Sequence, residues 1–360
     1  MDKKIKFAII GCGRVAGHHA RSMAQIKNGE LTAVCDLVKE KAESFGKEFG
    51  VPFYVSYNEM LKKHDVDVVN IITPSGMHPS HAEDIITKHK KHVVIEKPMY
   101  MNMKDKKRLA DLSSKYGVKI FPVFQNRYNK AVKKVKSGLE KQMFGKLVMG
   151  SVKLLWSRPQ RYYDRDPWRG KWSMDGGALT NQGIHYLDLL RWFMGEIEYV
   201  SAMGATRLVD IEVEDVGIAI VKFKSGALGS IEITTAARPD DIEANVAVFG
   251  EKGRAIIAGI ATNKLVEWTM DKADLSEHSE DFPTVYGFGH GELLQDVVND
   301  LLGIAPHPIP FQQGSNAVEL LNAIYVSIET NSVVKMSDMP ASKNLGRHDQ
   351  ALFDMYTTKG

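Results

Sequence analysis

Cysteine is scarce in this sequence, because Cys12 and Cys35 are the only two thiols among 360 residues. So few thiols argue against a disulfide framework and against a metal site built from thiolates. No window approaches the roughly 20 consecutive apolar residues that a membrane-spanning helix requires. The first residues, MDKKIKFAIIGCG, run directly into a short strand pattern and lack the apolar core and cleavage site of a signal peptide. We therefore expect a cytoplasmic protein with no membrane partner.

Excess charge of one sign is also missing, because the sequence has 47 Lys and Arg residues and 44 Asp and Glu residues, which give a net charge of +3. The electrostatic field of so small a net charge does not predict nucleic acid or a membrane surface as a partner. Low-complexity segments are absent as well, and a content of 44% hydrophobic and 25% charged residues is typical of a folded globular protein. Because single hydrophobic cores stop growing at about 250 to 300 residues, the length predicts two domains.

Short apolar runs alternate with amphipathic helix patterns over the first third of the chain. IKFAII, ELTAVCD, DVDVVNIIT, HVVIEKP and VKIFPVF have the composition of buried strands, and helical periods separate them. This rhythm predicts a parallel sheet with helices on both faces. After residue 123 come longer strands joined by glycine turns such as FKSGALG and FGEKGRA, which indicate antiparallel hairpins. We predict an α/β protein with a Rossmann domain at 1–123 and a second α/β domain at 124–360, whose open sheet is mainly antiparallel.

The segment AIIGCGRVAGHHA follows the first strand and opens a helix. Gly11 allows the tight turn, Gly13 lets the backbone approach a pyrophosphate, and the small Ala16 lets helix and strand pack closely. The second strand ends at Asp36, where a carboxylate would accept hydrogen bonds from a ribose hydroxyl and repel a 2′-phosphate. The pattern predicts a dinucleotide site that prefers NAD to NADP, although the nearby Lys39 leaves NADP open.

A lysine stands at the end of the strand VVIEKPM, directly after Glu96 and before Pro98. Open α/β sheets bind ligands at the carboxyl edge, where this strand ends. A lone lysine at such a place is usually solvated, but next to a dinucleotide site a functional role for Lys97 is favoured.

The segment ALTNQGIHYLDLL has the apolar content of a buried helix interrupted by polar residues. In a helix Asn181 and His185 share one face, because they are four residues apart. His185 is a candidate general base, since the ordinary pKa of histidine, about 6.5, is close to neutral pH. For Asp188 we favour a structural role.

A loop rich in arginine and aromatic rings precedes that helix. The guanidinium group of arginine binds carboxylates and phosphates through paired hydrogen bonds, and aromatic rings stack on sugars or bases. Single-stranded RNA would suit the same composition, but the small net charge and the dinucleotide motif favour a small anionic ligand. The loop, WSRPQRYYDRDPWRGKW, contains Arg158, Arg161, Arg165, Arg169 and Lys171 among five Trp and Tyr residues.

Taken in order, IIGCGRVAGHH, AVCD, IITPSGMHPSHA, VVIEKPM and GGALTNQGIHYLDLLRWFMG resemble the glucose-fructose oxidoreductase/inositol dehydrogenase/MocA family over essentially the whole chain. The resemblance implies a Rossmann domain that binds NAD and a C-terminal α/β domain whose sheet often mediates oligomers. It also implies that Lys97 and His185 act on a sugar hydroxyl beside the nicotinamide, with either one as the proton acceptor. The aspartate that the family places four residues before the histidine falls on Asn181, which is better suited to orientation or substrate binding.

Within the family, the NRYN segment, the YYDRDPWRGKW loop and DGGALTNQGIHYLDLLRW most resemble the UDP-N-acetylglucosaminuronic acid 3-dehydrogenases of surface-polysaccharide synthesis. This resemblance implies oxidation of the C3 hydroxyl of UDP-2-acetamido-2-deoxy-D-glucuronate, and a homotetramer. The residues expected to bind NAD are Gly11, Gly13, Arg14, Val15, Asp36, Thr73, Pro74, His78, Glu96, Lys97, Asn126, Trp168 and Arg169. Those expected to bind the substrate are Lys97, Arg158, Tyr163, Lys171, Asn181, His185 and His290.

Two other functions stay open at this point. A dehydrogenase of free sugars or inositols would use the same motifs, and a regulator could bind NAD or a sugar without catalysis. A metal site is not expected, because the spacing of His78 and His81, and of His290 and Glu292, brings no third ligand into view.

Overall fold

A computed structural model describes residues 3–357 of the protein. The chain divides into two compact units. Of the described residues, the first unit contains 3–123 together with the later segments 290–315 and 348–357, and the second contains 124–289 and 316–347. The change of unit at 123 and 124 lies where the sequence pattern changes. The two later segments that return to the first unit carry no comparable signal in the sequence.

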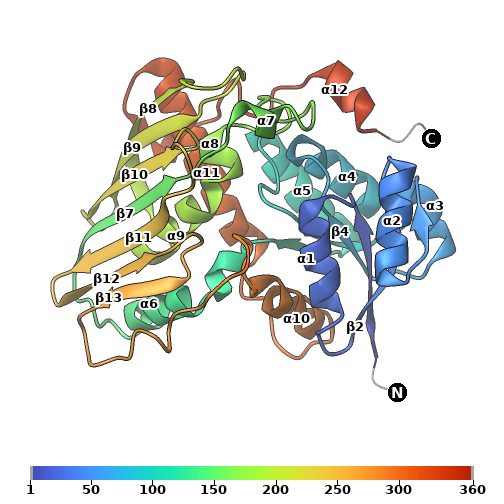
Figure 1. Cartoon of the computed structure of the whole chain (residues 1–360), viewed down its shortest axis with the longest axis horizontal. Helices are drawn as coiled ribbons and strands as arrows, with labels where there is room; N and C mark the ends of the chain where they lie inside the picture. Colours follow the sequence, from blue (N-terminus) through green and yellow to red (C-terminus); the bar gives the residue numbers. More distant parts are fainter. Residues whose placement is uncertain (1–2, 358–360) are drawn as a thin grey trace. The chain divides into compact units, whose positions relative to one another are not determined.

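The first unit is built on a six-stranded parallel sheet in the order β3-β2-β1-β4-β5-β6 (Figure 1). This is the Rossmann-type order, and the predicted fold class is confirmed. The crevice that such sheets offer to ligands lies where the strand order reverses, between β1 and β4. The strands are β1 (Ile5–Ile10), β2 (Gly29–Cys35), β3 (Phe53–Tyr54), β4 (Val68–Ile71), β5 (His92–Ile95) and β6 (Ile120–Pro122).

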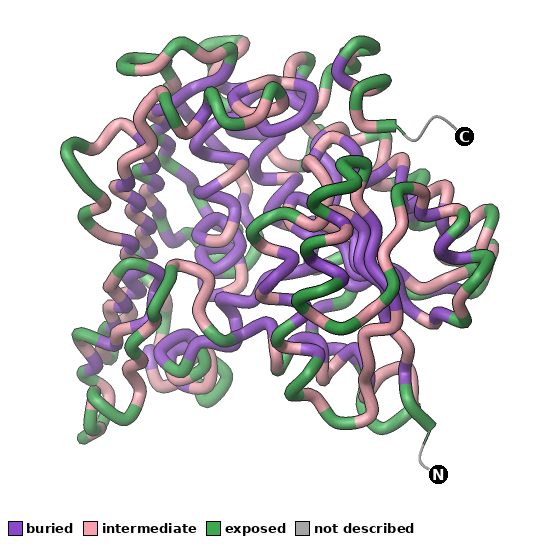
Figure 2. Tube along the Cα trace, turned by 45° about the vertical axis from the view of Figure 1, so that its right-hand side comes forward, coloured by how far each residue is buried: buried purple, intermediate pink, exposed green. Residues whose placement is uncertain are grey.

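Helices cover both faces of this sheet, which accounts for the apolar composition of its strands. Every residue of β4 is buried, and so are all but one residue each of β1 and β5, because helices shield them from water on both faces. Figure 2 shows these strands in purple between helices that carry exposed residues. The helices are α1 (Arg14–Met23), α2 (Lys39–Phe49), α3 (Tyr57–Lys63), α4 (His78–Asp84), α5 (Met103–Tyr116), α10 (Gly289–Leu301) and α12 (Gln350–Met355), with a π-helical turn at Ile85–His89.

The second unit contains an eight-stranded sheet in the order β13-β12-β11-β7-β10-β9-β8-β14. All neighbours are antiparallel except β7 and β10, and the predicted hairpins form as β9–β10 and β11–β12. The strands are β7 (Leu147–Leu155), β8 (Ile197–Ala205), β9 (Val216–Phe223), β10 (Leu228–Thr234), β11 (Glu243–Gly250), β12 (Gly253–Ala258), β13 (Lys264–Trp268) and β14 (Val334–Lys335). The helices are α6 (Lys130–Glu140), α7 (Gln160–Tyr163), α8 (Ala178–Asn181), α9 (Ile184–Met194) and α11 (Phe311–Thr330), which begins in the first unit.

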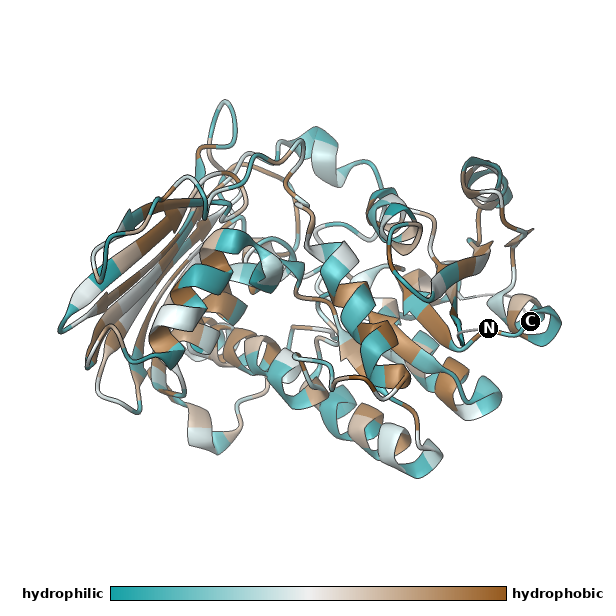
Figure 3. Ribbon diagram, turned by 90° about the horizontal axis from the view of Figure 1, so that it is seen from below, coloured by the Kyte–Doolittle hydropathy of each residue, from teal (hydrophilic) through white to brown (hydrophobic). Residues whose placement is uncertain are grey.

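The two faces of this second sheet differ. Helix α9 packs against β7 and β11 so closely that a Cβ on Gly150 would lie 2.6 Å from Met194. The opposite face of β8, β9 and β10 carries exposed apolar side chains, among them Met203, Ile218 and Ile220. Figure 3 shows hydrophobic residues on the strands of this sheet. Among residues 3–357, no helix combines the length and apolar character needed to cross a bilayer.

Candidate active site

The glycine loop after β1 has the backbone that its sequence requires. Gly11 has a φ of +90°, and a Cβ there would lie 2.5 Å from the carbonyl oxygen of Ile72, so only glycine fits. A Cβ on Gly13 would meet no described atom within 4 Å. Gly13 and Arg14 are exposed at the first turn of α1, where backbone N–H groups attract phosphates. The loop therefore fits the pyrophosphate of a dinucleotide.

Asp36 is held beside this loop at the end of β2. Its carboxylate accepts hydrogen bonds from the backbone N–H groups of Cys12 and Val38, both at 2.8 Å. The side chain is half-buried, and its remaining lone pairs can accept from the hydroxyls of a ribose. A cavity of about 320 Å³ lies next to it, lined by Cys12 and by residues of α2. These features fit the NAD that the sequence predicts.

Both cysteines lie beside Asp36 and stay protonated. Burial first, and the charge of Asp36 second, raise the pKa of the Cys35 thiol to about 12. The same causes raise the pKa of Cys12. Neither thiol is in a disulfide.

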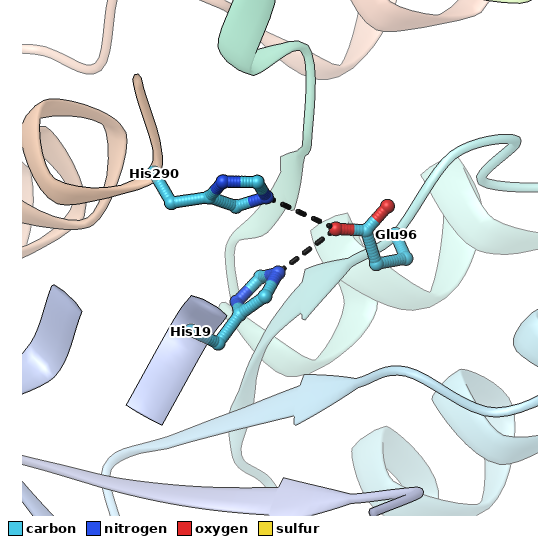
Figure 4. A group of neighbouring side chains, drawn as sticks. All are labelled: His19, Glu96 and His290. Atoms are coloured by element: carbon cyan, nitrogen blue, oxygen red, sulfur yellow. Dashed lines mark hydrogen bonds and ion pairs between the residues drawn. The ribbon is translucent and has the colours of Figure 1, made fainter. Parts of the chain in front are cut away.

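Lys97 follows β5 at the carboxyl edge of the sheet. Within residues 93–101, all of which the structure describes, Lys97 is the only residue that is not buried. Its backbone N–H donates to the carboxylate of Glu96 at 3.1 Å. The other carboxylate oxygen of Glu96 faces His19 and His290 (Figure 4). The strand end thus presents one lysine from an otherwise buried segment.

His78 connects the loop after β4 to the loop after β5. Its two ring nitrogens lie 2.8 Å from the carbonyl oxygens of Thr73 and Pro98. Burial lowers the pKa of His78, although both carbonyls act in the opposite direction. The hydroxyl of Thr73 contacts His81 at 3.0 Å, while Pro74 is half-buried beside it. The structure thus explains how His78 shapes this edge, and its predicted contact with the nicotinamide stays a prediction.

In the second unit, the predicted single helix around His185 is two helices, α8 and α9. They separate at Gln182 and Gly183, and a Cβ on Gly183 would lie 2.7 Å from the carbonyl oxygen of Leu179. Between residues 173 and 191, all of which are described, only Asn181 and His185 are not buried. The break therefore leaves the two predicted polar residues accessible in an otherwise buried segment.

Asp175 is a site residue that the sequence analysis missed. It is only 1% exposed, and one of its oxygens accepts from the backbone N–H of Gly170 at 2.8 Å. Its other oxygen accepts from the side-chain amide of Asn181. The reverse amide orientation would place two oxygens against each other, so the NH₂ group of Asn181 faces Asp175. The only sequence signal was an acidic residue six positions before Asn181, at the start of DGGALTN.

Asp188 has the structural role expected for it. It forms a two-pronged ion pair with Arg127, in which Nε and Nη2 donate to the two carboxylate oxygens at 2.8 and 2.6 Å. Both side chains are buried, at 5% and 2% exposed. Asn126, predicted to bind NAD, precedes this arginine in a buried 3₁₀ turn at Gln125–Tyr128.

The basic loop holds its cations against acidic partners. Arg158 pairs with Asp241 at 2.8 Å, and Lys171 pairs with Glu212 at 3.0 Å. Arg169 pairs with Asp166 at 3.0 Å and lies over the ring of Trp168, with 4.4 Å between its guanidinium carbon and the ring centre. Every one of these cations is at least partly accessible.

A cavity of about 310 Å³ lies within this loop region of the second unit. Arg169 and Lys171 line it together with Tyr163, whose hydroxyl lies 3.0 Å from that of Thr235. Burial raises the pKa of Tyr163, so its hydroxyl stays protonated and can donate or accept a hydrogen bond. Asp164, Asp166 and Asp210 line the same cavity, so its charge does not by itself select an anion.

The glycine loop, the carboxylate after β2 and the strand-end lysine define the NAD-binding half of an oxidoreductase. Residues 5–124 match the family described as "Oxidoreductase family, NAD-binding Rossmann fold", and residues 132–256 match the "GFO/IDH/MocA C-terminal domain". The chain belongs to the GFO/IDH/MocA oxidoreductase family, and NAD is its cofactor.

Relatives of known activity cover nearly the whole chain. The myo-inositol 2-dehydrogenase of Thermotoga maritima is 29% identical over 345 residues, which are 93% of this chain and 99% of the relative. The crystal structure of the WlbA dehydrogenase from Bordetella pertussis, in complex with NADH and UDP-GlcNAcA, is 37% identical with a TM-score of 0.88. That match covers 93% of this chain and 98% of the other. The WlbA structure from Chromobacterium violaceum, with the same two ligands, is 35% identical with a TM-score of 0.87 and covers 93% and 96%. The protein is an NAD-dependent dehydrogenase of sugars or polyols.

Proposed function

We propose that the protein oxidises the C3 hydroxyl of UDP-2-acetamido-2-deoxy-D-glucuronate to a 3-keto sugar with NAD⁺, in the cytoplasm, as a step of surface-polysaccharide synthesis. The chemistry rests on one observation above all, namely that Lys97, Asn181 and His185 are the accessible residues of otherwise buried segments. The substrate is supported by the likeness to the WlbA dehydrogenases and by the partly accessible cations of the basic loop. A carboxylate and a diphosphate are the anions that such cations bind.

Oxidation of an alcohol removes a hydroxyl proton and a hydride from the same carbon. NAD⁺ accepts the hydride when bound, so the protein must supply a base and stabilise the charge that grows on oxygen. His185 is one candidate base, and Asn181 binds the substrate or orients the imidazole. Lys97 stabilises the developing alkoxide as an ammonium, or takes the proton as an amine.

The remaining predicted residues divide between the two ligands. Arg158, Tyr163 and Lys171 bind the anionic substrate, and Trp168 and Arg169 bind the cofactor. Glu96 and Asn126 support the nicotinamide half. The pyrophosphate and ribose are bound by Gly11, Gly13, Arg14, Val15 and Asp36, and the nicotinamide edge is formed by Thr73, Pro74 and His78.

Kinetic measurements on Lys97→Ala and His185→Asn test the two catalytic roles. We expect each variant to lose about a hundredfold or more in kcat, while the Kd for NAD⁺ stays within a few-fold. Isothermal titration with NAD⁺ measures the second quantity. Near-normal turnover in either variant would remove that residue from the mechanism.

The substrate itself is tested by incubating the protein with NAD⁺ and a panel of nucleotide sugar acids, free sugars and inositols, and recording NADH absorbance. The likeness to myo-inositol 2-dehydrogenase favours a second candidate, oxidation of a free polyol. Inhibition by UDP supports the nucleotide sugar, and its absence supports the polyol. Binding of both ligands without any NADH would instead indicate a regulator.

A further inference from the structure

Three buried side chains from distant parts of the sequence meet inside the first unit. His19 comes from α1, Glu96 follows β5, and His290 comes from the start of α10 (Figure 4). Nε2 of His19 lies 2.8 Å from Oε1 of Glu96, and Nε2 of His290 lies 3.6 Å from the same oxygen. Each residue offers one possible metal-ligand atom, and these three atoms lie within 4.8 Å of one another. We call these three residues the His–Glu–His cluster.

As a hydrogen-bond network, this cluster leaves buried polar atoms unpaired. The amide of Asn70 donates to Nδ1 of His19 at 2.9 Å, so the proton of that imidazole must lie on Nε2, toward Glu96. The carbonyl oxygen of Asn70 then has no partner among the described residues, and neither ring nitrogen of His290 has a hydrogen bond there. Asn70 is fully buried and His290 is 2% exposed. Unpaired atoms at such depth are rare in proteins, and a bound ion is one of the arrangements that would pair them.

A single cation between the three residues would pair most of these atoms. It would take Nε2 of both histidines and Oε1 of Glu96 as ligands. His19 would then carry its proton on Nδ1 and donate it to the oxygen of Asn70, after the amide turns over. The other oxygen of Glu96 already accepts from the backbone of Lys97, which fixes the orientation of the carboxylate.

We propose that His19, Glu96 and His290 bind one divalent transition-metal ion, such as Zn²⁺, with a water molecule as fourth ligand. Two imidazoles and one carboxylate suit Zn²⁺ or Co²⁺ and do not suit Mg²⁺ or Ca²⁺, which prefer oxygen. The ion links α1, the end of β5 and α10, and so stabilises the backbone that carries Lys97. This assigns His290 to the ion in place of the substrate contact predicted from the sequence. The proposal does not rest on the identity of the substrate.

Cobalt titration of the full-length chain, without a histidine tag and after treatment with a chelator, tests the site. We expect one equivalent of Co²⁺ to bind, with the visible absorption of a four-coordinate ion, and Zn²⁺ to displace it. Elemental analysis after dialysis against Zn²⁺ should give one ion per chain. Bound Zn²⁺ should also raise the melting temperature.

Variants locate the ion. His19→Ala and His290→Ala should each weaken Co²⁺ binding on the order of a hundredfold, since even an outer partner of a metal ligand is worth about tenfold to a hundredfold. Asn70→Ala should weaken it about tenfold for that reason. His18→Gln is the matched control and should bind normally, because this neighbouring ring is half-buried and its centre lies 6.1 Å from that of His290.

Absence of stoichiometric Co²⁺ or Zn²⁺ from the wild-type protein overturns the proposal, as does unchanged binding in both histidine variants. The cluster is then a hydrogen-bond network that only orients Glu96. Should an alanine variant fail to fold, Glu96→Gln keeps the shape of the side chain and must still lower the affinity for Co²⁺. Formation of NADH from the sugar panel tests the proposed function separately, so the two can fail independently.

Discussion

At the scale of single residues, the acidic partner of Asn181 changes how the site is understood. The family pattern places an aspartate at this position, and an amide cannot orient a histidine by charge. Asp175 supplies the carboxylate from six residues upstream and fixes the amide with its NH₂ group inward. In this orientation the amide oxygen of Asn181 is a hydrogen-bond acceptor. We infer that Asp175 is a positioning residue that acts through Asn181.

Asp175→Asn should therefore lower kcat more than it raises KM. The loss of the charged acceptor lets the amide of Asn181 rotate, and misplacement of about 1 Å costs on the order of a hundredfold in rate. Steady-state kinetics give the two constants, and a melting curve shows whether the fold is intact. Asp240→Asn is the control, since this aspartate is exposed and does not line the cavity of the second unit. Equal changes of kcat in the two variants would argue against the role of Asp175.

Glu214 makes the stability of the second unit depend on pH. Burial raises its pKa from 4.5 to about 7, against hydrogen bonds from the backbone of Leu179 and the hydroxyl of Tyr325. An acid with a raised pKa binds its proton more tightly in the folded state. The stabilisation is therefore complete below about pH 4.5 and is lost as the pH rises to about 7.

Glu214→Gln should remove the loss of stability that accompanies the rise in pH. Relative to the wild type, the variant should gain stability between about pH 5 and pH 8, by no more than about 3 kcal/mol. Urea unfolding at a series of pH values measures the difference. The exposed Glu232→Gln is the control and should show no such gain. A pH-independent difference for Glu214→Gln would mean that the carboxyl group titrates normally.

At the scale of elements, the turn between β1 and α1 contains two glycines that are needed for different reasons. Gly11 is required by its own backbone, because of its positive φ and the nearby Ile72 oxygen. Gly13 has a φ of −81°, which any residue adopts, and a side chain there would meet no described atom within 4 Å. The absence of a side chain at Gly13 is thus explained by the cofactor and not by the fold.

Gly11→Ala should therefore affect mainly stability, and Gly13→Ala should affect mainly the binding of NAD⁺. The first should destabilise the protein by about 1 to 2 kcal/mol from the left-handed backbone alone, and by more with the clash. The second should leave the melting temperature nearly unchanged and weaken NAD⁺ binding by about tenfold or more, because the added methyl group keeps the pyrophosphate away. Thermal unfolding and fluorescence titration with NADH make the comparison. Normal NADH affinity in Gly13→Ala would remove this loop from the cofactor site.

At the scale of the whole molecule, an apolar sheet face is left uncovered by the chain itself. Met203, Ile218, Ile220 and Leu228 are 55% to 75% exposed on neighbouring strands β8, β9 and β10. Apolar patches of this kind usually mark protein interfaces. We propose that this face joins copies of the chain into the homotetramer that the resemblance implies.

Ile220→Lys should then reduce the mass of the particle in solution, since a charge cannot be buried unpaired in such an interface. Ile304→Lys provides a matched control, because Ile304 is 67% exposed in the first unit while Ile220 is 64% exposed. Light scattering coupled to size-exclusion chromatography measures the mass. A wild-type monomer, or an unchanged mass in Ile220→Lys, would contradict the proposed interface.

The sequence by itself determined the features that depend on neighbouring residues. The parallel sheet follows from apolar runs alternating with helical periods, and the NAD loop follows from glycines directly after a strand. Lys97 and His185 were predicted as catalytic residues because each stands in a short motif. Local pattern is enough for such features, since hydrogen bonding within elements and burial of their faces act over a few residues.

Only the tertiary structure decided which distant side chains meet. The pairing of Asp175 with Asn181 depends on a loop path, and the break between α8 and α9 overrides a helical pattern that runs through it. Residues 19, 96 and 290 belong to elements separated by up to 271 positions, and no spacing along the chain relates them. Their meeting is set by how whole helices and strands pack, because burial rewards contacts regardless of separation in the sequence.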